Sequence, residues 1–148
     1  RNNRIMRWDK GMEEGVTILQ GALLGPLSEI ITEPMGMRLD LVRSQLYVVD
    51  NGNQRVLRFS LTSLGEIDGE GEVVAGTTGV VGSNATTFDN PTSIFVEFDS
   101  RTVWVSDSRN YRIMRWDYQG TEGYAIVTQM FGKPYGVTVF ADALYWSD

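Results

Sequence analysis

One trio of polar residues recurs along this chain: an aspartate, an asparagine and an arginine at fixed spacing. The trios are Asp50, Asn53 and Arg55, then Asp107, Asn110 and Arg112, with Asn2 and Arg4 as an incomplete first set and Asp148 as an incomplete last one. A carboxylate accepts charge-assisted hydrogen bonds from arginine, and asparagine is favoured in the turn between them. Catalysis normally uses one unrepeated cluster, whereas this trio recurs. We therefore interpret it as a structural turn with an ion pair.

Several carboxylates follow the same turns and could bind calcium, which takes oxygen ligands. They are Glu13, Glu14, Glu66, Asp68, Glu70 and Glu72. The Asp-x-Asp-x-Asp-Gly spacing of a calcium loop is absent, so we interpret them as solubilising loop charges. The chain has no cysteine and no histidine, which removes disulfides, the usual zinc ligands and the usual general base. We expect no cofactor, with calcium as the alternative.

Asn84, Ala85 and Thr86 match the acceptor sequence for N-glycosylation. The segment Asn90-Pro91-Thr92 does not, because its central residue is proline. Glycine, serine and threonine are frequent over 76–90, so we expect Asn84 to be exposed in a loop. If the chain is secreted, Asn84 is the expected site of an N-glycan.

Short strands must position these residues. The segments after the turns alternate apolar and polar residues, as half-buried strands do. The runs that end in aspartate, 46–50, 103–107 and 144–148, are apolar at successive positions, which indicates strands covered on both faces. Further strands are expected at 16–19, 36–41, 72–75, 93–98, 124–127 and 136–140. This gives four strands per unit and twelve in all, while 21–33 could hold one helical turn.

The units are about 1–50, 51–107 and 108–148, within a single domain over 1–148. A period of this size indicates a repeat architecture. Strands covered on both faces favour sheets stacked as propeller blades, each covered by its neighbours, and a β-sandwich is the alternative. Aromatic residues at repeated strand positions are expected to pack between the sheets. They are Trp8, Tyr47, Trp104, Trp116, Tyr145 and Trp146.

Four segments match a known pattern: LYVVDNGNQRVLRFS (46–60), GEVVAGTTGVVG (71–82), FDNPTSIFVEF (88–98) and VWVSDSRNYRIMRWD (103–117). They resemble NHL repeats, the blades of a six-bladed β-propeller family. The resemblance implies an all-β, NHL-type propeller segment of three four-stranded blades. Since propellers close with about four to eight blades, three are incomplete alone. We expect completion to six blades by a second chain or by the rest of a longer chain, with an open assembly as the alternative.

Charge and hydropathy argue against two classes of partner. A net charge of −6 and a pI near 4.6 disfavour a nucleic-acid-binding surface. No apolar run reaches the roughly 20 residues of a membrane span. The chain begins with Arg1 and shows no signal-peptide pattern, so we expect a processed product or a segment of a longer protein.

These observations favour a non-catalytic, extracellular scaffold or protein-interaction module that self-associates through unclosed blade faces. Its expected partners are proteins, either further copies of the chain or neighbouring propeller repeats. The alternative is a metal-dependent hydrolase, since the chain resembles propeller lactonases at the level of the fold. In those enzymes acidic and asparagine side chains hold a metal in the central tunnel. Asp40 and Glu97 occupy equivalent strand positions here, but two carboxylates alone do not make such a site.

Overall fold

The computed structural model describes residues 2–21, 31–128 and 132–148. The described part of the chain forms twelve strands and two short 3-10 helices, so the predicted all-β class is confirmed. The strands are β1 (Arg4–Arg7), β2 (Val16–Gln20), β3 (Pro34–Asp40), β4 (Gln45–Asp50), β5 (Arg55–Leu61), β6 (Ile67–Gly76), β7 (Pro91–Glu97), β8 (Thr102–Asp107), β9 (Arg112–Trp116), β10 (Tyr124–Val127), β11 (Gly136–Phe140) and β12 (Ala143–Ser147). The 3-10 helices are η1 (Asn51–Asn53) and η2 (Ser108–Asn110). Most of the predicted helical turn at 21–33 falls on 22–30, outside the described residues.

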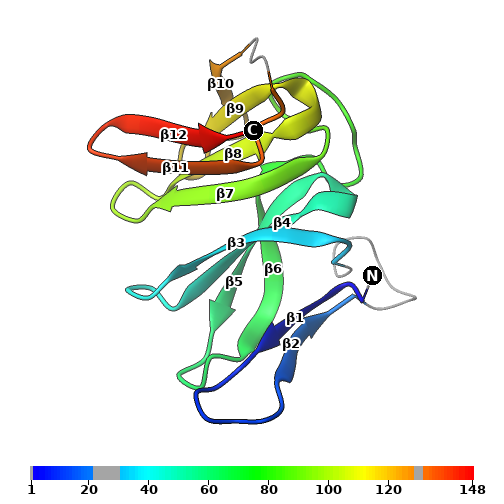
Figure 1. Ribbon diagram of the computed structural model, residues 1–148, viewed down its shortest axis with the longest axis vertical. Coiled ribbons are helices and arrows are strands. Elements are labelled where there is room, and N and C mark those ends of the chain that lie inside the picture. Colours follow the sequence, from blue (N-terminus) through cyan, green and yellow to red (C-terminus); the bar gives the residue numbers. More distant parts are fainter. Residues whose placement is uncertain (1, 22–30, 129–131) are drawn as a thin grey trace.

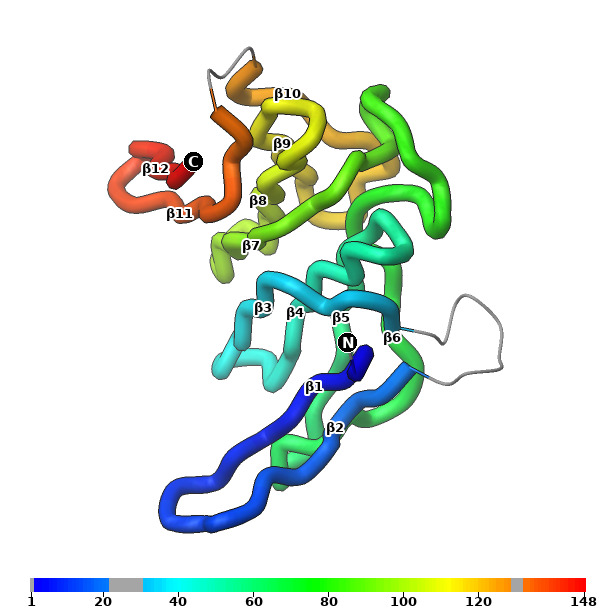
Figure 2. The backbone as a smooth tube through the Cα atoms, turned by 45° about the vertical axis from the view of Figure 1, so that its right-hand side comes forward, coloured from blue at the N-terminus to red at the C-terminus, as the bar shows by residue number. Residues whose placement is uncertain are grey.

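The strands form two four-stranded antiparallel sheets flanked by two hairpins. The first sheet has the order β3-β4-β5-β6, and the second has the order β7-β8-β9-β10. The N-terminal hairpin is β1-β2, and the C-terminal hairpin is β11-β12. Figure 1 shows the two sheets face to face in the middle, with one hairpin beyond each of them. Figure 2 shows the same four units following one another in chain order, as in a fan that is not closed.

The repeat units read from the sequence are offset from these sheets by two strands. The unit boundaries after residues 50 and 107 lie between β4 and β5 and between β8 and β9, inside a sheet. The recurring turn therefore joins neighbouring strands, and Asp50 pairs opposite Arg55 as Asp107 pairs opposite Arg112. The three expected four-stranded blades are present as two complete sheets and two half-sheets.

Apolar side chains fill the space on both faces of the first sheet. Val49 lies in the core shared with the second sheet, whereas Val48 lies in the core shared with the N-terminal hairpin. Both valines have no exposed surface. Adjacent residues of a strand point to opposite faces, so this pair confirms that β4 is covered on both sides.

An aromatic ring rests on a glycine in three of the four units. Trp8 lies on Gly15, Phe59 on Gly71 and Trp116 on Gly123, and a Cβ at these glycines would lie 2.4, 2.6 and 2.5 Å from the rings. Such distances are below ordinary van der Waals contact. The glycine thus makes room for the ring. This pairing escaped the sequence analysis because the number of residues between ring and glycine varies.

Replacing Gly123 by alanine should lower the free energy of unfolding by about 1–3 kcal/mol, because the new methyl group overpacks the site against Trp116. Urea unfolding followed by circular dichroism measures this. The same change in a Trp116→Leu background should cost less, since the smaller side chain leaves space. An equal cost in both backgrounds would contradict the assignment of Trp116 as the obstacle.

Candidate functional site

The first trio forms a buried polar turn between β4 and β5. One carboxylate oxygen of Asp50 accepts a hydrogen bond from the backbone N–H of Thr32 at 2.7 Å. The other accepts from Asn53 Nδ2 at 2.9 Å and from Arg55 Nε at 2.8 Å. Asp50 and Arg55 are both fully buried. Three donors, one of them the Arg55 guanidinium, thus converge on the Asp50 carboxylate.

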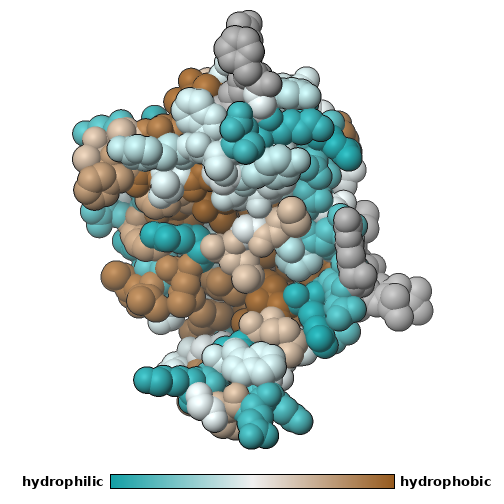
Figure 3. Space-filling view, in the orientation of Figure 1, coloured by the Kyte–Doolittle hydropathy of each residue, from teal (hydrophilic) through white to brown (hydrophobic). Residues whose placement is uncertain are grey.

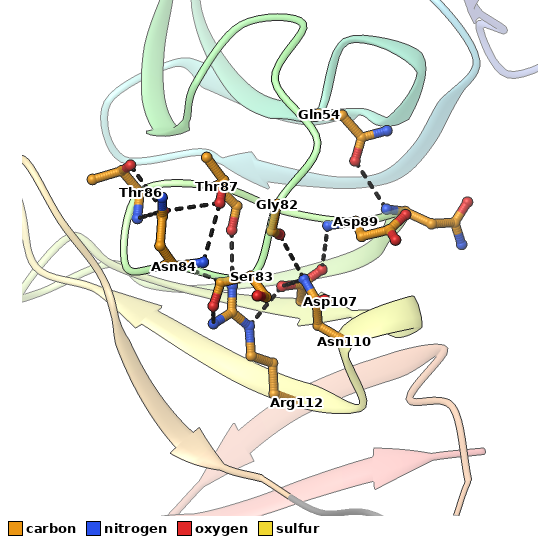
Figure 4. A network of polar contacts seen from close by, with 11 residues as sticks. Gln54, Gly82, Ser83, Asn84, Thr86, Thr87, Asp89, Asp107, Asn110 and Arg112 are labelled. Carbon is orange, nitrogen blue, oxygen red and sulfur yellow. Dashed lines mark hydrogen bonds and ion pairs between the residues drawn. The ribbon is translucent and has the colours of Figure 1, made fainter.

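The second trio repeats the first almost bond for bond (Figure 4). Asp107 accepts from the backbone N–H of Asp89 at 2.7 Å, from Asn110 Nδ2 at 2.8 Å and from Arg112 Nε at 2.7 Å. Burial raises the pKa of the Asp107 carboxyl, and the hydrogen bonds from Asn110, the Asp89 N–H and Arg112 oppose that rise. Without these three donors, burial would raise this pKa further.

Arg112 also fixes the long connection between the first and second sheets. Its terminal nitrogens donate to the carbonyl oxygens of Ser83 at 2.6 Å, Asn84 at 3.0 Å and Thr87 at 2.8 Å. Figure 4 shows the guanidinium of Arg112 beneath this loop, with the loop residues turned toward it. The arginine therefore joins the turn of its own sheet to the preceding segment of chain.

The outermost members of the predicted set have no such partners. Asn2, Arg4 and Asp148 are exposed, and among the described residues neither Arg4 nor Asp148 forms an ion pair. The backbone still keeps the repeat geometry, because Asn3 has φ 43°, close to 56° at Gln54 and 52° at Tyr111. Arg4 instead borders a cavity of about 500 Å³. Within the described residues, the N-terminal end thus keeps the backbone of the turn without its ion pair.

The expected sequon lies on the surface, as its loop composition suggested. Asn84 is exposed, and its Oδ1 accepts from the backbone N–H of Thr86 at 2.9 Å and from the Thr86 hydroxyl at 3.0 Å. The Thr87 hydroxyl donates to the same oxygen at 2.9 Å. Figure 4 shows the Asn84 side chain between Thr86 and Thr87, with dashed lines to both. The acceptor amide is held in a turn, next to the Thr86 hydroxyl.

The two carboxylates considered for catalysis, Asp40 and Glu97, accept hydrogen bonds from residues of their own sheets and turns. Asp40 accepts from the backbone N–H of Val42 and from Arg43, which also donates to the Phe98 carbonyl at 2.8 Å. Burial alone would raise the pKa of Asp40, but the bonds from Arg43 and from Val42 outweigh it and hold this pKa below its ordinary value. Glu97 accepts from Trp104 Nε1 at 2.9 Å and from the Ser100 hydroxyl at 3.0 Å.

The six acidic residues interpreted as loop charges do not assemble into a site, and three of them, Asp68, Glu70 and Glu72, lie on β6 rather than in a loop. Within residues 2–21, 31–128 and 132–148, no three acidic side chains come close enough to hold a metal ion together. Glu72 instead pairs with Arg58, whose side chain is mostly buried. Arg115, at the same position of the second sheet, is half-exposed beside Asp117.

Apolar side chains lie uncovered at positions that are buried elsewhere in the repeat. On β3, Met37 is 51% and Leu39 44% exposed, whereas Ile94 and Val96 at the same positions of β7 are 6% and 1% exposed. Figure 3 shows hydrophobic surface gathered over β3 and the turn after it, down to the N-terminal hairpin. We call Met35, Met37 and Leu39 the open face of the first sheet.

The end hairpins show the same contrast, which corrects part of the sequence analysis. Trp116 and Tyr47 are buried as expected. Trp8 is 62%, Tyr145 55% and Trp146 47% exposed, although the repeat predicts them between sheets. At Trp116 and Tyr47 a neighbouring sheet covers the ring, whereas among the described residues each end hairpin has a neighbouring sheet on one side only. The hairpins are the incomplete units of the fan.

Solved structures share this arrangement of strands. The nidogen/laminin complex matches 99% of this chain with 19% identity and a TM-score of 0.70. A structural genomics protein of unknown function from Bacteroides thetaiotaomicron matches 98% with 18% identity and a TM-score of 0.71. A luciferin-regenerating enzyme matches 90% with 14% identity and a TM-score of 0.60. This chain is an open β-propeller segment.

The segment spans 50%, 39% and 40% of those three chains respectively, and at such identities the likeness shows the fold alone. No protein-family model matches the sequence, and no curated protein matches it. None of the described helices is long and apolar enough to cross a membrane.

Proposed function

We propose that this segment is a non-catalytic scaffold of NHL-type propeller repeats that binds protein and associates with itself through its uncovered sheet faces. The open face of the first sheet supports this most directly. Met37 and Leu39 are exposed where the equivalent Ile94 and Val96 pack against a neighbouring sheet. Large exposed apolar patches are typical of protein interaction sites.

The NHL assignment is supported by the geometry of the two complete trios. In both, the aspartate binds an asparagine three residues later and an arginine five residues later, at nearly equal distances. The match to the nidogen/laminin complex, a structure of two interacting proteins, is consistent with a protein partner. The proposed scaffold needs no bound cofactor.

Self-association predicts a molar mass that rises above one chain as the concentration increases. Sedimentation equilibrium of the 148-residue chain measures this. The Met37→Ser/Leu39→Ser variant should weaken association by at least about tenfold, since each buried methylene contributes about 0.8 kcal/mol. Leu64→Ser is the matched control, because Leu64 is 71% exposed on a turn outside the open face. A single-chain mass at all concentrations would overturn the self-association.

We further propose that the segment is extracellular and carries an N-glycan on Asn84. The exposed amide and the adjacent Thr86 hydroxyl fit an acceptor site. Material secreted from eukaryotic cells should show a mass increase that peptide N-glycosidase removes. The Asn84→Gln variant should lack the increase, whereas Asn90→Gln should keep it. An unmodified mass for the secreted wild-type chain would contradict this proposal.

A further inference from the structure

We propose that β12 of one copy pairs antiparallel with β1 of a second copy, Asp148 opposite Arg4, and that two such junctions close a ring of two copies. This inference rests on the proposed self-association and specifies its partner and register. Both strands have one unpaired edge among the described residues, because β1 pairs only with β2 and β12 only with β11. An unpaired strand edge is a template for another strand.

The two internal junctions supply the register. In the first sheet Asp50 lies opposite Arg55 and Tyr47 opposite Arg58. In the second sheet Asp107 lies opposite Arg112 in the same way. Applied to the chain ends, this register gives one set of pairs between copies. The pairs are Asp148 with Arg4, Ser147 with Ile5, Trp146 with Met6, Tyr145 with Arg7 and Leu144 with Trp8.

Charge complementarity identifies a second copy as the occupant. Arg4 occupies the position of the buried Arg55 and Arg112, but it is exposed and has no ion pair among the described residues. Asp148 occupies the position of the buried Asp50 and is likewise exposed. Each end of the chain thus carries the charge that the other lacks. Joining them recreates the third ion pair of the repeat.

In this register, two side chains that face each other across the junction are equivalent to a pair that already interacts within the second sheet. There, Arg115 lies over the ring of Trp104, with the guanidinium carbon 5.9 Å from its centroid. The equivalent pair at the junction is Arg7 of one copy and Tyr145 of the other. A guanidinium over an aromatic face is attractive in this geometry.

The junction also covers the open face. In the repeat, β11 packs against β7 and β8 of the preceding sheet. A β11-β12 hairpin joined to β1 of a second copy comes to lie beside that copy's first sheet, where Met37 and Leu39 are uncovered. The exposed Trp8 takes the place of the buried Trp116. The side chains left uncovered within one chain become the core between two.

The number of copies follows from counting sheets. For the 148-residue segment, the described residues of each copy contribute two complete sheets, and each junction completes one more from two hairpins. Two copies therefore give six sheets, one copy gives three and three copies give nine. Closed propellers have about four to eight blades. Only two copies fall within that range.

Disulfide trapping tests the register directly, because the chain contains no cysteine. Opposed residues in a sheet have Cα atoms about 4.5–5.5 Å apart, within reach of a disulfide. An equimolar mixture of Arg7→Cys and Tyr145→Cys should form covalent two-chain species under mild oxidation. The matched control mixes Met6→Cys with Tyr145→Cys, since Met6 points to the opposite face. The double variant Arg7→Cys/Tyr145→Cys should give a covalent pair and nothing larger.

A charge exchange provides a second test that does not depend on cysteine. Arg4→Asp and Asp148→Arg should each weaken association by at least about tenfold, because a like-charge pair replaces an ion pair. The variant carrying both changes should recover most of the loss. No recovery would overturn the proposed contact between these residues.

The outcomes separate this inference from the proposed function. Cross-linking only in the Met6 mixture, or none in a protein with two-chain mass, overturns the register but leaves self-association standing. A ladder of longer covalent multimers in the double variant overturns ring closure. A wild-type protein with single-chain mass at every concentration overturns both.

Discussion

Asp107→Ala should lower the free energy of unfolding by about 3–5 kcal/mol, because it leaves the buried charge of Arg112 uncompensated. It also removes the acceptor for Asn110 and for the backbone N–H of Asp89. Urea unfolding monitored by tryptophan fluorescence measures the loss. The effect is large because partners from both sides of the turn converge on this one carboxylate.

The matched control is Asp117→Ala, which removes an exposed carboxylate paired with Arg115. Exposed ion pairs contribute about 0–1 kcal/mol, so this variant should unfold almost as the wild type does. Similar losses in the two variants would contradict the structural role assigned to the trio.

Trp116→Ala should also cost about 3–5 kcal/mol, because it opens a cavity in the core between the two sheets. The indole is 2% exposed and its ring centroid lies 4.8 Å from that of Phe88. Thermal unfolding should show a single transition at lower temperature. A variant that unfolds like the wild type would place this ring outside the core.

Trp8→Ala is the control at the same position of the repeat. Trp8 is 62% exposed in one chain, so the free energy of unfolding should change by about 0.5 kcal/mol or less at concentrations where light scattering gives a single-chain mass. The same substitution should instead weaken association between chains. A loss in the single chain equal to that of Trp116→Ala would contradict the comparison.

Much of the fold could be predicted because the same local sequence patterns recur in each repeat unit. The apolar run before Asp50 identified β4 and its two covered faces, as Val48 and Val49 show. The fixed spacing from Asp50 to Arg55 and from Asp107 to Arg112 identified the turns. Such local signals need no knowledge of distant contacts.

Other features depend on what lies next to each strand. Trp8 and Trp116 have almost identical sequence surroundings, RIMRWD in both, yet one is exposed and the other buried. The pattern predicts the face of a side chain but not whether a sheet covers that face. The hydrogen bonds from Arg112 to three loop carbonyls could not be predicted either. Every residue has a backbone carbonyl, so the sequence does not indicate which carbonyls an arginine will reach.

The polar contacts between consecutive sheets have a consequence for the shape of any closed assembly. Asn51 Nδ2 donates to the Pro91 carbonyl at 2.7 Å, and Gln54 Oε1 accepts from the Asn90 N–H at 2.9 Å. Apolar contact is non-directional and tolerates a range of tilts, whereas hydrogen bonds restrict both distance and angle. The angle between neighbouring sheets is therefore set by these hydrogen bonds rather than by the apolar core between the sheets. Removing one of these hydrogen bonds should change the curvature of the assembly more than it changes the free energy of unfolding.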